Sequence, residues 1–411
     1  MSRFIFLLLV LSCTLQLHAQ TKRVLFLGNS YTQVNNLPLT FSNLALSGGD
    51  TVYTDMNAPG GYTFQGHSTN ATSLAKIAQG NWDFVVLQEQ SQMPSFPPAQ
   101  VESDTYPYAH MLDSLIHVAD SCAETVFYMT WGRKYGDQSN CAFYPILCTF
   151  DGMQSRLRYS YVEMGDLNHA SVAPAGEAWK RCRELDSTIN LYQADNSHPS
   201  IEGTYLTACV FYSTLFQKSP VGLSYTSGLS TPVASFLQQV AYDVVFDSLD
   251  TWNVAIDHPH PAFTISQLNA TTIELNNQST DADSYLWIIN GNTYYGSPLV
   301  HDFGTIGTYT VIQQVSNSCF TDTLSFTINL ATVGINDNSP DEIQIYPNPS
   351  DGLVYITGAA NSIANLYDLN GRLLKSEKIN AELHFEEMPA SVYILEIVTP
   401  NGLIRKKLIR E

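Results

Sequence analysis

Short apolar runs alternate with longer helical stretches between residues 22 and 252, and this alternation constrains the fold most strongly. Continuous apolar runs, each bounded by polar or turn residues, occur at 24–27, 84–87 and 125–129. Such runs are typical of strands that are buried on both faces, and strands that alternate with helices form parallel sheets. Helices are expected at 37–46, 108–119, 201–215 and 231–249, the last with Thr231 as N-cap and Pro232 as its first residue. The sequence predicts an α/β domain with helices on both faces of a parallel sheet.

Two polar linkers divide the chain, and their positions define the expected domains. The first linker spans 257–261 and carries prolines, and the second spans 336–341. Between and after them, Thr, Ile, Val and Tyr alternate with Gly-containing turns, which is typical of short antiparallel strands. The predicted domains are an α/β domain at 21–252, a small β-sandwich at 259–331 and a second small all-β sandwich at 341–411.

The N-terminal residues have the pattern of a secretory signal peptide, predicted at 1–19. Arg3 precedes the apolar run 4–11, which is too short to span a bilayer, and small residues follow at 17–20. An alternative is a loose lipobox whose Cys13 is acylated. No later segment is apolar enough to cross a membrane.

In an oxidising compartment some of the other six cysteines are expected to pair, with Cys141 and Cys148 nearest in sequence, but spacing does not determine the connectivity.

Charge excludes two classes of partner. With 38 acidic against 19 basic residues the net charge is −19, whereas binding to nucleic acid or to an anionic membrane needs clustered Lys and Arg. No cysteine has a second cysteine or a histidine at zinc-ligand spacing, so a structural zinc site is not expected.

Ser30, Asp195 and His198 are the residues best suited to catalysis. Ser30 follows the first predicted strand, where ligands bind in open parallel sheets. Asp195 precedes His198 by three residues in a short segment before Pro199. Nucleophilic serine catalysis needs a base for the hydroxyl proton and an acid group that holds the imidazole tautomer. The structural alternative is that Gly28 permits a bend and Ser30 only caps a helix.

These segments resemble the SGNH (GDSL-like) hydrolases, a family with a three-layer α/β/α flavodoxin-like fold. Residues 27–32, Leu-Gly-Asn-Ser-Tyr-Thr, are similar to the first family block, with Asn29 where many members have aspartate. Residues 195–199 are similar to the last block, Asp-x-x-His. Residues 58–63, Ala-Pro-Gly-Gly-Tyr-Thr, resemble the second block, whose glycine N–H helps form the oxyanion hole. The resemblance places that role on Gly61, with Gly60 as the alternative.

The third block departs from the family pattern Gly-x-Asn-Asp. After the strand 84–87 the chain reads Gln88-Glu89-Gln90-Ser91, which puts Gln90 at the position of the asparagine donor and leaves Gln88 as the fallback. A divergent SGNH branch with Leu-Gln-Glu-Gln-Ser here, and with Ala-Pro-Ala-Gly-Glu-Ala-Trp at 173–179, is similar to this chain. The resemblance implies a catalytic Ser30, His198 and Asp195, an oxyanion hole of Ser30, Gly61 and Gln90, and no metal or cofactor.

The substrate expected from the resemblance is an acylated small molecule or a glycan. Trp131 and Trp179 are candidate substrate-binding residues that could stack on a sugar ring, although packing is the alternative. An exported esterase of this kind would remove acyl groups from polysaccharide. The competing hypothesis is a surface glycan-binding or adhesion protein whose hydrolase fold is catalytically degenerate.

The two C-terminal parts resemble known modules. A tryptophan-containing strand at 285–289 and Gly-Thr-Tyr-Thr-Val at 307–311 are similar to a PKD-like sandwich. Tyr-Pro-Asn-Pro at 346–349, Asn-Gly at 370–371 and the basic residues 405–407 resemble the C-terminal sorting domain of the Bacteroidetes type IX secretion system. This resemblance implies contact with that secretion machinery and a secreted or cell-surface location.

Overall fold

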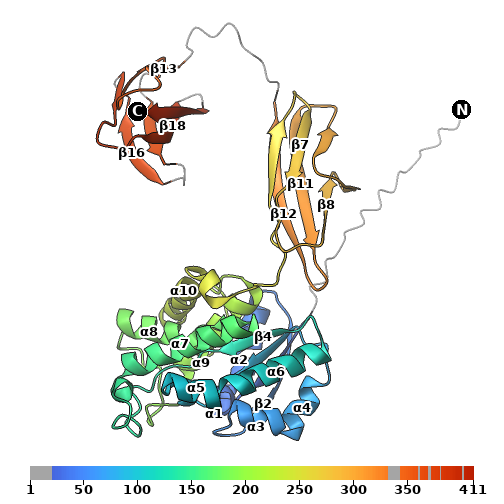
Figure 1. Cartoon of the computed structure of the whole chain (residues 1–411), viewed down its shortest axis with the longest axis vertical. Coiled ribbons are helices and arrows are strands. Elements are labelled where there is room, and N and C mark those ends of the chain that lie inside the picture. The colour runs from blue at the N-terminus through green and yellow to red at the C-terminus, as the bar shows by residue number, and fades with distance from the viewer. Residues whose placement is uncertain (1–20, 332–342, 360–361, 369–371, 380, 400–401) are drawn as a thin grey trace, which may run out of the picture. The chain divides into compact units, whose positions relative to one another are not determined.

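The computed structural model describes residues 21–331, 343–359, 362–368, 372–379, 381–399 and 402–411 (Figure 1). The chain divides into two compact units, with the boundary between Leu330 and Ala331. The predicted signal peptide, Cys13, the linker at 336–341 and the Asn-Gly pair at 370–371 lie outside the described residues.

A five-stranded parallel sheet forms the centre of the first unit. Its strands are β1 (Lys22–Leu27), β2 (Val52–Asn57), β3 (Phe84–Leu87), β4 (Glu124–Tyr128) and β5 (Ser171–Ala173), in the order β2-β1-β3-β4-β5. All of these pairings are parallel. This is the flavodoxin-like order, in which ligands bind at the carboxyl ends of β1 and β3, where the direction of winding reverses.

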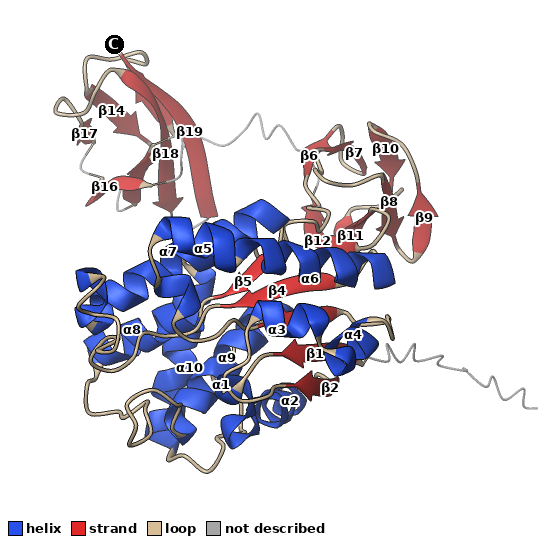
Figure 2. Cartoon of the chain, turned by 60° about the horizontal axis from the view of Figure 1, so that its bottom comes forward, coloured by secondary structure: helices blue, strands red, loops and turns tan. Residues whose placement is uncertain are grey.

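Helices cover both faces of this sheet (Figure 2). Alternate residues of β1 point to opposite sides, with Val24 and Phe26 in one apolar cluster and Leu25 and Leu27 in the other. The first cluster includes α2 (Leu37–Ser47), α8 (Ala175–Leu185), α9 (Ile201–Phe216) and α10 (Thr231–Phe246). The second includes α3 (Phe64–Thr69), α4 (Ala71–Ile77), α6 (Tyr106–Ala119) and α7 (Phe150–Asn168). Shorter helices are α1 (Ser30–Gln33), α5 (Pro98–Asp104), η1 (Val34–Asn36), η2 (Met93–Ser95), η3 (Pro145–Cys148) and η4 (Leu249–Trp252). The predicted three-layer fold class is confirmed.

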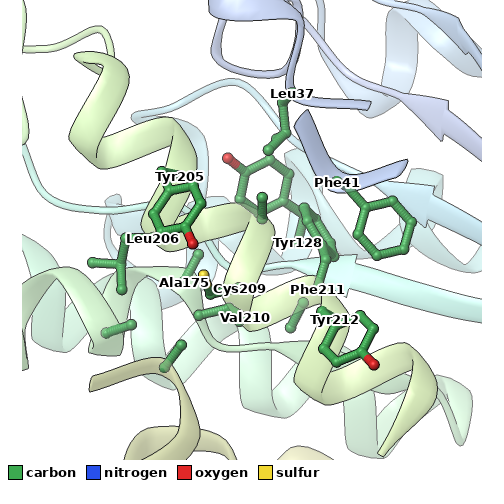
Figure 3. Packing of buried hydrophobic residues seen from close by; sticks show 14 of the residues in the cluster. Leu37, Phe41, Tyr128, Ala175, Tyr205, Leu206, Cys209, Val210, Phe211 and Tyr212 are labelled. Atoms are coloured by element: carbon green, nitrogen blue, oxygen red, sulfur yellow. The ribbon is translucent and has the colours of Figure 1, made fainter. Parts of the chain in front are cut away.

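Helix α9 is buried around most of its circumference, which is typical of a helix that is apolar on all sides. Figure 3 shows Tyr205 and Phe211 of α9 packed with Phe41 of α2 and Tyr128 of β4. The helix begins after Ser200, whose side chain accepts a hydrogen bond from the Gly203 N–H at 3.1 Å. Its buried position therefore anchors the segment that precedes it, which contains His198.

Some elements differ from the sequence expectation. Helix α10 ends at Phe246, and its N-cap is Ser230, so Pro232 is the second helical residue and not the first. Strands β2 and β5 were not predicted. β2 lies at the sheet edge and is only partly buried, and β5 has three residues, so neither shows the long apolar run of a central strand.

Antiparallel sheets make up the rest of the described chain. One sheet contains β10 (Leu299–Asp302), β7 (Thr272–Asn277) and β6 (Phe263–Gln267), and another contains β12 (Thr321–Leu330), β11 (Gly307–Ser316), β8 (Ser284–Ile289) and β9 (Asn292–Tyr294). In the second unit one sheet contains β13 (Gln344–Tyr346), β14 (Leu353–Thr357) and β17 (Glu382–His384), and the other contains β16 (Leu373–Lys378), β15 (Ile363–Tyr367), β18 (Ser391–Thr399) and β19 (Gly402–Arg410). The prediction of all-β parts after the α/β part is confirmed.

Two disulfides lie within the first unit. Cys141 and Cys148 close a loop after β4, and Cys122, just before β4, is bonded to Cys319 between β11 and β12. The pairing of Cys122 with Cys319 spans 197 positions, which is why spacing along the chain did not reveal it.

None of the helices in the described ranges combines the length and the apolar character needed to cross a bilayer.

Candidate active site

Ser30 is the first residue of α1, which begins directly after β1 at the carboxyl edge of the sheet. Gly28 allows the end of β1 to lie close to Thr32 and Gln88, because a Cβ atom there would meet Thr32 Oγ1 and would lie 2.7 Å from Gln88 Oε1. The N-cap of α1 is Asn29, whose side chain accepts a hydrogen bond from the Tyr31 N–H. The N-cap of this helix is therefore Asn29, and the alternative hypothesis that Ser30 only caps the helix is wrong.

The structure brings Ser30, His198 and Asp195 together. Ser30 Oγ lies 2.9 Å from His198 Nε2, although the residues are 168 positions apart. On the other side of the ring, His198 Nδ1 is hydrogen-bonded to the Asp195 carboxylate. Because a carboxylate only accepts, Nδ1 carries the proton and Nε2 accepts from the Ser30 hydroxyl. This tautomer is the one that a serine nucleophile needs from its base.

Asp195 is held in its ionised form by its hydrogen bonds. Its Oδ1 accepts from the backbone N–H groups of Ser197 and His198, both at 3.0 Å. Partial burial by itself raises the pKa of Asp195, but the hydrogen bond from the His198 ring and these two N–H groups outweigh it, and the pKa lies below its ordinary value. The negative charge can therefore stabilise an imidazolium at His198.

The turn at 193–198 is fixed by contacts with two aromatic residues. The Trp131 Nε1–H donates to the Ser197 carbonyl at 3.0 Å, and the Tyr31 hydroxyl lies 2.6 Å from Ser197 Oγ. The Tyr31 ring also meets the His198 ring edge to face at 5.4 Å. Asn196, at the centre of the turn, has a φ of 60°, a left-handed conformation that Asn tolerates. These contacts place the His198 ring over Ser30.

The prediction that Trp131 and Trp179 bind substrate is wrong, because both side chains have no exposed surface. Their rings are stacked on each other at 3.6 Å, and Tyr31 is stacked on Trp131 at 4.9 Å. We call Tyr31, Trp131 and Trp179 the aromatic column. Indole faces inside such a column cannot meet a ligand. The column instead supports the turn that carries His198.

The backbone N–H groups of Ser30 and Gly61 donate to no acceptor among the described residues. Gly61 is exposed and has a φ of +70°, the left-handed region that favours glycine. The Asn29 Nδ2–H donates to the Tyr62 carbonyl at 3.0 Å, which ties the loop containing Gly61 to the turn containing Ser30. The predicted Gly61 lies in a loop that is fastened beside the serine, and Gly60 precedes it in the same turn.

Gln88 is engaged on both sides of its amide. Its Oε1 accepts from the Asn29 N–H at 2.9 Å and from the Thr32 hydroxyl at 3.0 Å, while its Nε2 donates to the Glu89 carbonyl. Its side chain is completely buried. Gln88 therefore supports the turn at Ser30 and does not fit the alternative role of oxyanion donor.

Gln90 has a partly exposed side chain whose amide is oriented by its neighbours. Its Oε1 accepts from the backbone N–H groups of Gln92 at 2.8 Å and Met93 at 3.3 Å. Its Nε2 donates to Gln92 Oε1 at 3.2 Å. An amide nitrogen carries two hydrogens. The second makes no hydrogen bond within the described residues, so Gln90 can still donate to a ligand.

Glu89 is a buried carboxyl group that the sequence reasoning missed. Its oxygens accept from the Phe64 N–H at 3.0 and 3.1 Å and from the Gln90 N–H at 2.6 Å. Burial, only partly offset by these hydrogen bonds, raises the pKa of Glu89 to about 8. Glu89 links the loop that follows Gly61 to Gln90. A glutamate two residues after a buried strand was the available signal.

His67 has a structural role in the same region. Its Nε2–H donates to the Gly28 carbonyl at 2.8 Å, so its Nδ1 accepts from the Ser73 hydroxyl at 2.7 Å. Burial lowers the pKa of His67, and the ring is neutral at neutral pH. His67 holds the end of β1 in place.

Across the described ranges, no three His, Cys, Asp or Glu side chains are grouped as metal ligands would be.

Comparisons with known proteins give one family match and several similar structures. Residues 344–411 match the family model of the secretion system C-terminal sorting domain. The chain therefore carries a type IX sorting domain and is exported to the cell surface or exterior, as predicted. The comparison with curated proteins finds no match.

Several solved structures are similar to this chain at low sequence identity, among them the following three. A DUF4886 family protein from Bacteroides uniformis is 16% identical with a TM-score of 0.47, over 55% of this chain and 95% of that one. A proposed SGNH hydrolase from Slackia heliotrinireducens is 27% identical with a TM-score of 0.39, over 48% and 100%. A psychrotrophic esterase from a Pseudoalteromonas species is 14% identical with a TM-score of 0.35, over 48% and 97%.

Proposed function

We propose that the exported chain is a serine esterase of the SGNH class that hydrolyses carboxylic esters. The observation that carries the proposal is the 2.9 Å hydrogen bond between Ser30 Oγ and His198 Nε2, with Asp195 on the far side of the ring. The imidazole can take the proton of the serine hydroxyl while the carboxylate holds the ring, which activates the hydroxyl for attack on an ester carbonyl.

The reaction proceeds in two half-reactions. Ser30 Oγ attacks the ester carbonyl carbon while its proton moves to His198 Nε2, and Asp195 stabilises the imidazolium. The tetrahedral intermediate then expels the alcohol, which takes the proton from His198. Water attacks the acyl group on Ser30 with His198 again acting as the base, and collapse of the second intermediate releases the carboxylic acid and restores the Ser30 hydroxyl.

The negative oxygen of each intermediate is stabilised by hydrogen-bond donors. We assign this role to the N–H groups of Ser30 and Gly61 and to the Gln90 amide, which have hydrogens free of partners within the described chain. A donor of this kind typically lowers the barrier by about 2.7–4 kcal/mol.

The direct test is hydrolysis of p-nitrophenyl acetate by the wild type and by Ser30→Ala. We expect the substitution to lower kcat by roughly 10⁴-fold or more, because the nucleophile is lost, while circular dichroism shows a retained fold. Ser103→Ala, an exposed serine on α5, is the matched control and should keep full activity. Turnover that persists in Ser30→Ala would exclude the mechanism, and an inactive wild type would favour a non-catalytic glycan-binding protein.

We further propose that the natural substrate is an acylated polysaccharide. The loop that follows β4 carries Tyr135, which is 62% exposed, and Phe143, which is 87% exposed. The Lys134 N–H donates to the Asn196 carbonyl at 3.0 Å, so this loop borders the turn that carries His198. Exposed aromatic rings can stack on the apolar faces of sugars.

This substrate class can be tested by release of acetate from acetylated polysaccharides, with Ser30→Ala as the blank. We expect Tyr135→Ala to raise KM for the polysaccharide and to leave hydrolysis of p-nitrophenyl acetate unchanged. Hydrolysis of small esters without release of acetate from any polysaccharide would contradict the substrate class and leave the esterase assignment in place.

A further inference from the structure

We infer that Asp137 is a positioning residue for the oxyanion hole, which acts on the Gln90 amide through Gln92. This inference rests on the proposed esterase function and goes beyond it by naming a residue outside the family blocks. Asp137 lies in the loop after β4, and its side chain has no exposed surface. The three residues form a chain of hydrogen bonds that runs from the carboxylate to the catalytic edge of the sheet.

Four donors converge on the Asp137 carboxylate. Oδ2 accepts from Gln92 Nε2 and from Asn140 Nδ2, both at 2.6 Å. Oδ1 accepts from the Ser139 N–H at 3.2 Å and from an Arg133 guanidinium nitrogen at 3.3 Å. A buried carboxylate is stable only when it is hydrogen-bonded or paired, and Arg133 also supplies the compensating charge. The position therefore requires a group that accepts on both oxygens.

The carboxylate sets the orientation of the Gln92 amide, and through Gln92 it acts on the Gln90 amide together with two backbone N–H groups. Because Asp137 cannot donate, Gln92 must turn its nitrogen toward Asp137 and its oxygen toward Gln90. Gln90 then directs its nitrogen to Gln92 Oε1 at 3.2 Å. The backbone N–H groups at 92 and 93, which donate to Gln90 Oε1, require the same orientation. The nitrogen of Gln90, and not its oxygen, therefore has a hydrogen left for a ligand.

The neighbours of Gln90 contact the neighbours of Ser30. The carbonyl of Glu89 accepts from Asn29 Nδ2 at 3.5 Å, and Ser91 lies beside the Tyr31 hydroxyl. The segment that contains Gln90 is therefore packed along the turn that contains the nucleophile. Orientation of the Gln90 amide decides whether a donor or an acceptor is offered to the intermediate.

The substitution Asp137→Asn replaces one of the two accepting oxygens with a nitrogen that donates. The Ser139 N–H and the Arg133 guanidinium can only donate, so the new amide keeps its oxygen toward them and turns its nitrogen toward Gln92. Gln92 then reverses its amide and directs its nitrogen at the Gln90 nitrogen. We expect kcat on p-nitrophenyl acetate to fall about tenfold to a hundredfold with KM nearly unchanged, since a transition-state donor is misdirected. Asp247→Asn, at an exposed carboxylate just after α10, is the matched control and should keep the wild-type kcat.

Two further variants distinguish positioning from a general loss of structure. Gln92→Glu added to Asp137→Asn supplies a carboxylate that accepts from both flanking amides, and we expect it to restore most of kcat. Gln92→Glu alone places two carboxylates together and should be impaired. In a Gln90→Ala background, Asp137→Asn should lower kcat no further, because the donor on which it acts is gone.

The outcomes separate this inference from the proposed function. An active, Ser30-dependent wild type in which Asp137→Asn keeps kcat, or lowers it equally with and without Gln90, would overturn the positioning role alone. Absence of any Ser30-dependent turnover by the wild type would overturn both. Rescue by the second substitution, together with the loss of effect in the Gln90→Ala background, supports the role assigned to Asp137.

Discussion

At the scale of single residues, Asn29 does more for the site than cap a helix. Its Oδ1 caps α1, and its Nδ2 donates to the carbonyls of Tyr62 at 3.0 Å and Glu89 at 3.5 Å. The side chain is buried. One amide therefore joins three segments around Ser30, and it needs both an acceptor and a donor end. An aspartate, which many SGNH proteins resembling this chain have at the position, offers only acceptors when ionised.

We therefore expect Asn29→Asp to weaken the site. Its second oxygen would face the carbonyls of Tyr62 and Glu89, and a buried unsatisfied polar group costs about 1–3 kcal/mol. Urea unfolding should show a lower free energy of unfolding, and kcat should fall because the loop of Gly61 is released. Unchanged stability and unchanged kcat would show that Nδ2 contributes nothing to this arrangement.

Glu89 makes stability depend on pH in a direction opposite to that of most carboxyl groups. Its pKa is raised from 4.5 to about 8 in the folded protein. The folded state therefore holds a proton that the unfolded state releases above pH 4.5. The stabilisation by this group is present in full below pH 4.5, and it is lost as the pH rises toward 8.

The expected result is a difference in pH dependence between the wild type and Glu89→Gln. Between about pH 5.5 and about pH 7 the free energy of unfolding of the wild type should fall relative to the variant by about 1.4 kcal/mol per pH unit, and the slope should flatten toward pH 8. Urea unfolding at four or five pH values gives this slope, and the variant controls for all other titrating groups. Parallel curves for the two proteins would contradict the raised pKa.

At the scale of elements, the turn at 193–198 depends on the aromatic column beneath it. The turn contains no regular structure, yet its Ser197 carbonyl and hydroxyl contact Trp131 and Tyr31. It is also joined to α9, which is packed into the apolar core. A rigid core thus positions a catalytic loop, so removal of a single contact from the column should alter catalysis more than binding.

Trp131→Phe tests this dependence. The substitution removes the donor to the Ser197 carbonyl while an aromatic ring remains in the column. We expect kcat to fall several-fold to about a hundredfold with little change in KM, as for a lost contact that matters in the transition state. Trp179→Phe is the matched control, because its Nε1–H donates to Thr207 and not to the turn. Equal losses of kcat in both variants would mean that general packing is responsible.

At the scale of the whole molecule, a disulfide connects the α/β part of the first unit to the sandwich that follows it. Cys122 precedes β4, and Cys319 lies between β11 and β12. Beside the bond, the His258 ring is stacked on Phe320 at 4.0 Å, and His258 Nε2 lies 3.0 Å from Glu124 Oε1. Closure of so long a segment of chain restricts the unfolded state strongly.

Replacing both Cys122 and Cys319 with serine should therefore lower the stability of this unit. The chain-entropy model gives about 5 kcal/mol for a closed loop of this length. In calorimetry we expect the sandwich to unfold in a separate transition at lower temperature, while turnover at 25 °C is kept. The Cys141→Ser and Cys148→Ser pair closes a much shorter loop and should cost about half as much. A single unchanged transition in the first variant would contradict the expectation.

Much of the fold and part of the site could be predicted from local patterns. Apolar runs and their polar boundaries are properties of neighbouring residues, and they revealed β1, β3 and β4, the helices α2, α6, α9 and α10, and the all-β nature of the later parts. Helices α3, α4, α5, α7 and α8 were not predicted. The serine after β1 and the carboxylate three residues before a histidine were visible for the same reason. Strands β2 and β5 were missed because an edge strand and a three-residue strand bury too little for a pattern to appear.

Contacts between distant segments could be determined only by the tertiary structure. These contacts depend on which distant segments meet in the folded chain. They include the burial of Trp131 and Trp179, the different roles of Gln88 and Gln90, the disulfide between Cys122 and Cys319, and the chain of hydrogen bonds from Asp137 to Gln90. Periodicity describes which face of an element is apolar, whereas the partner of a side chain depends on packing between elements. The sequence by itself determined the type of fold, the sorting domain and the candidate catalytic residues, and the tertiary structure decided which side chains face the reacting group.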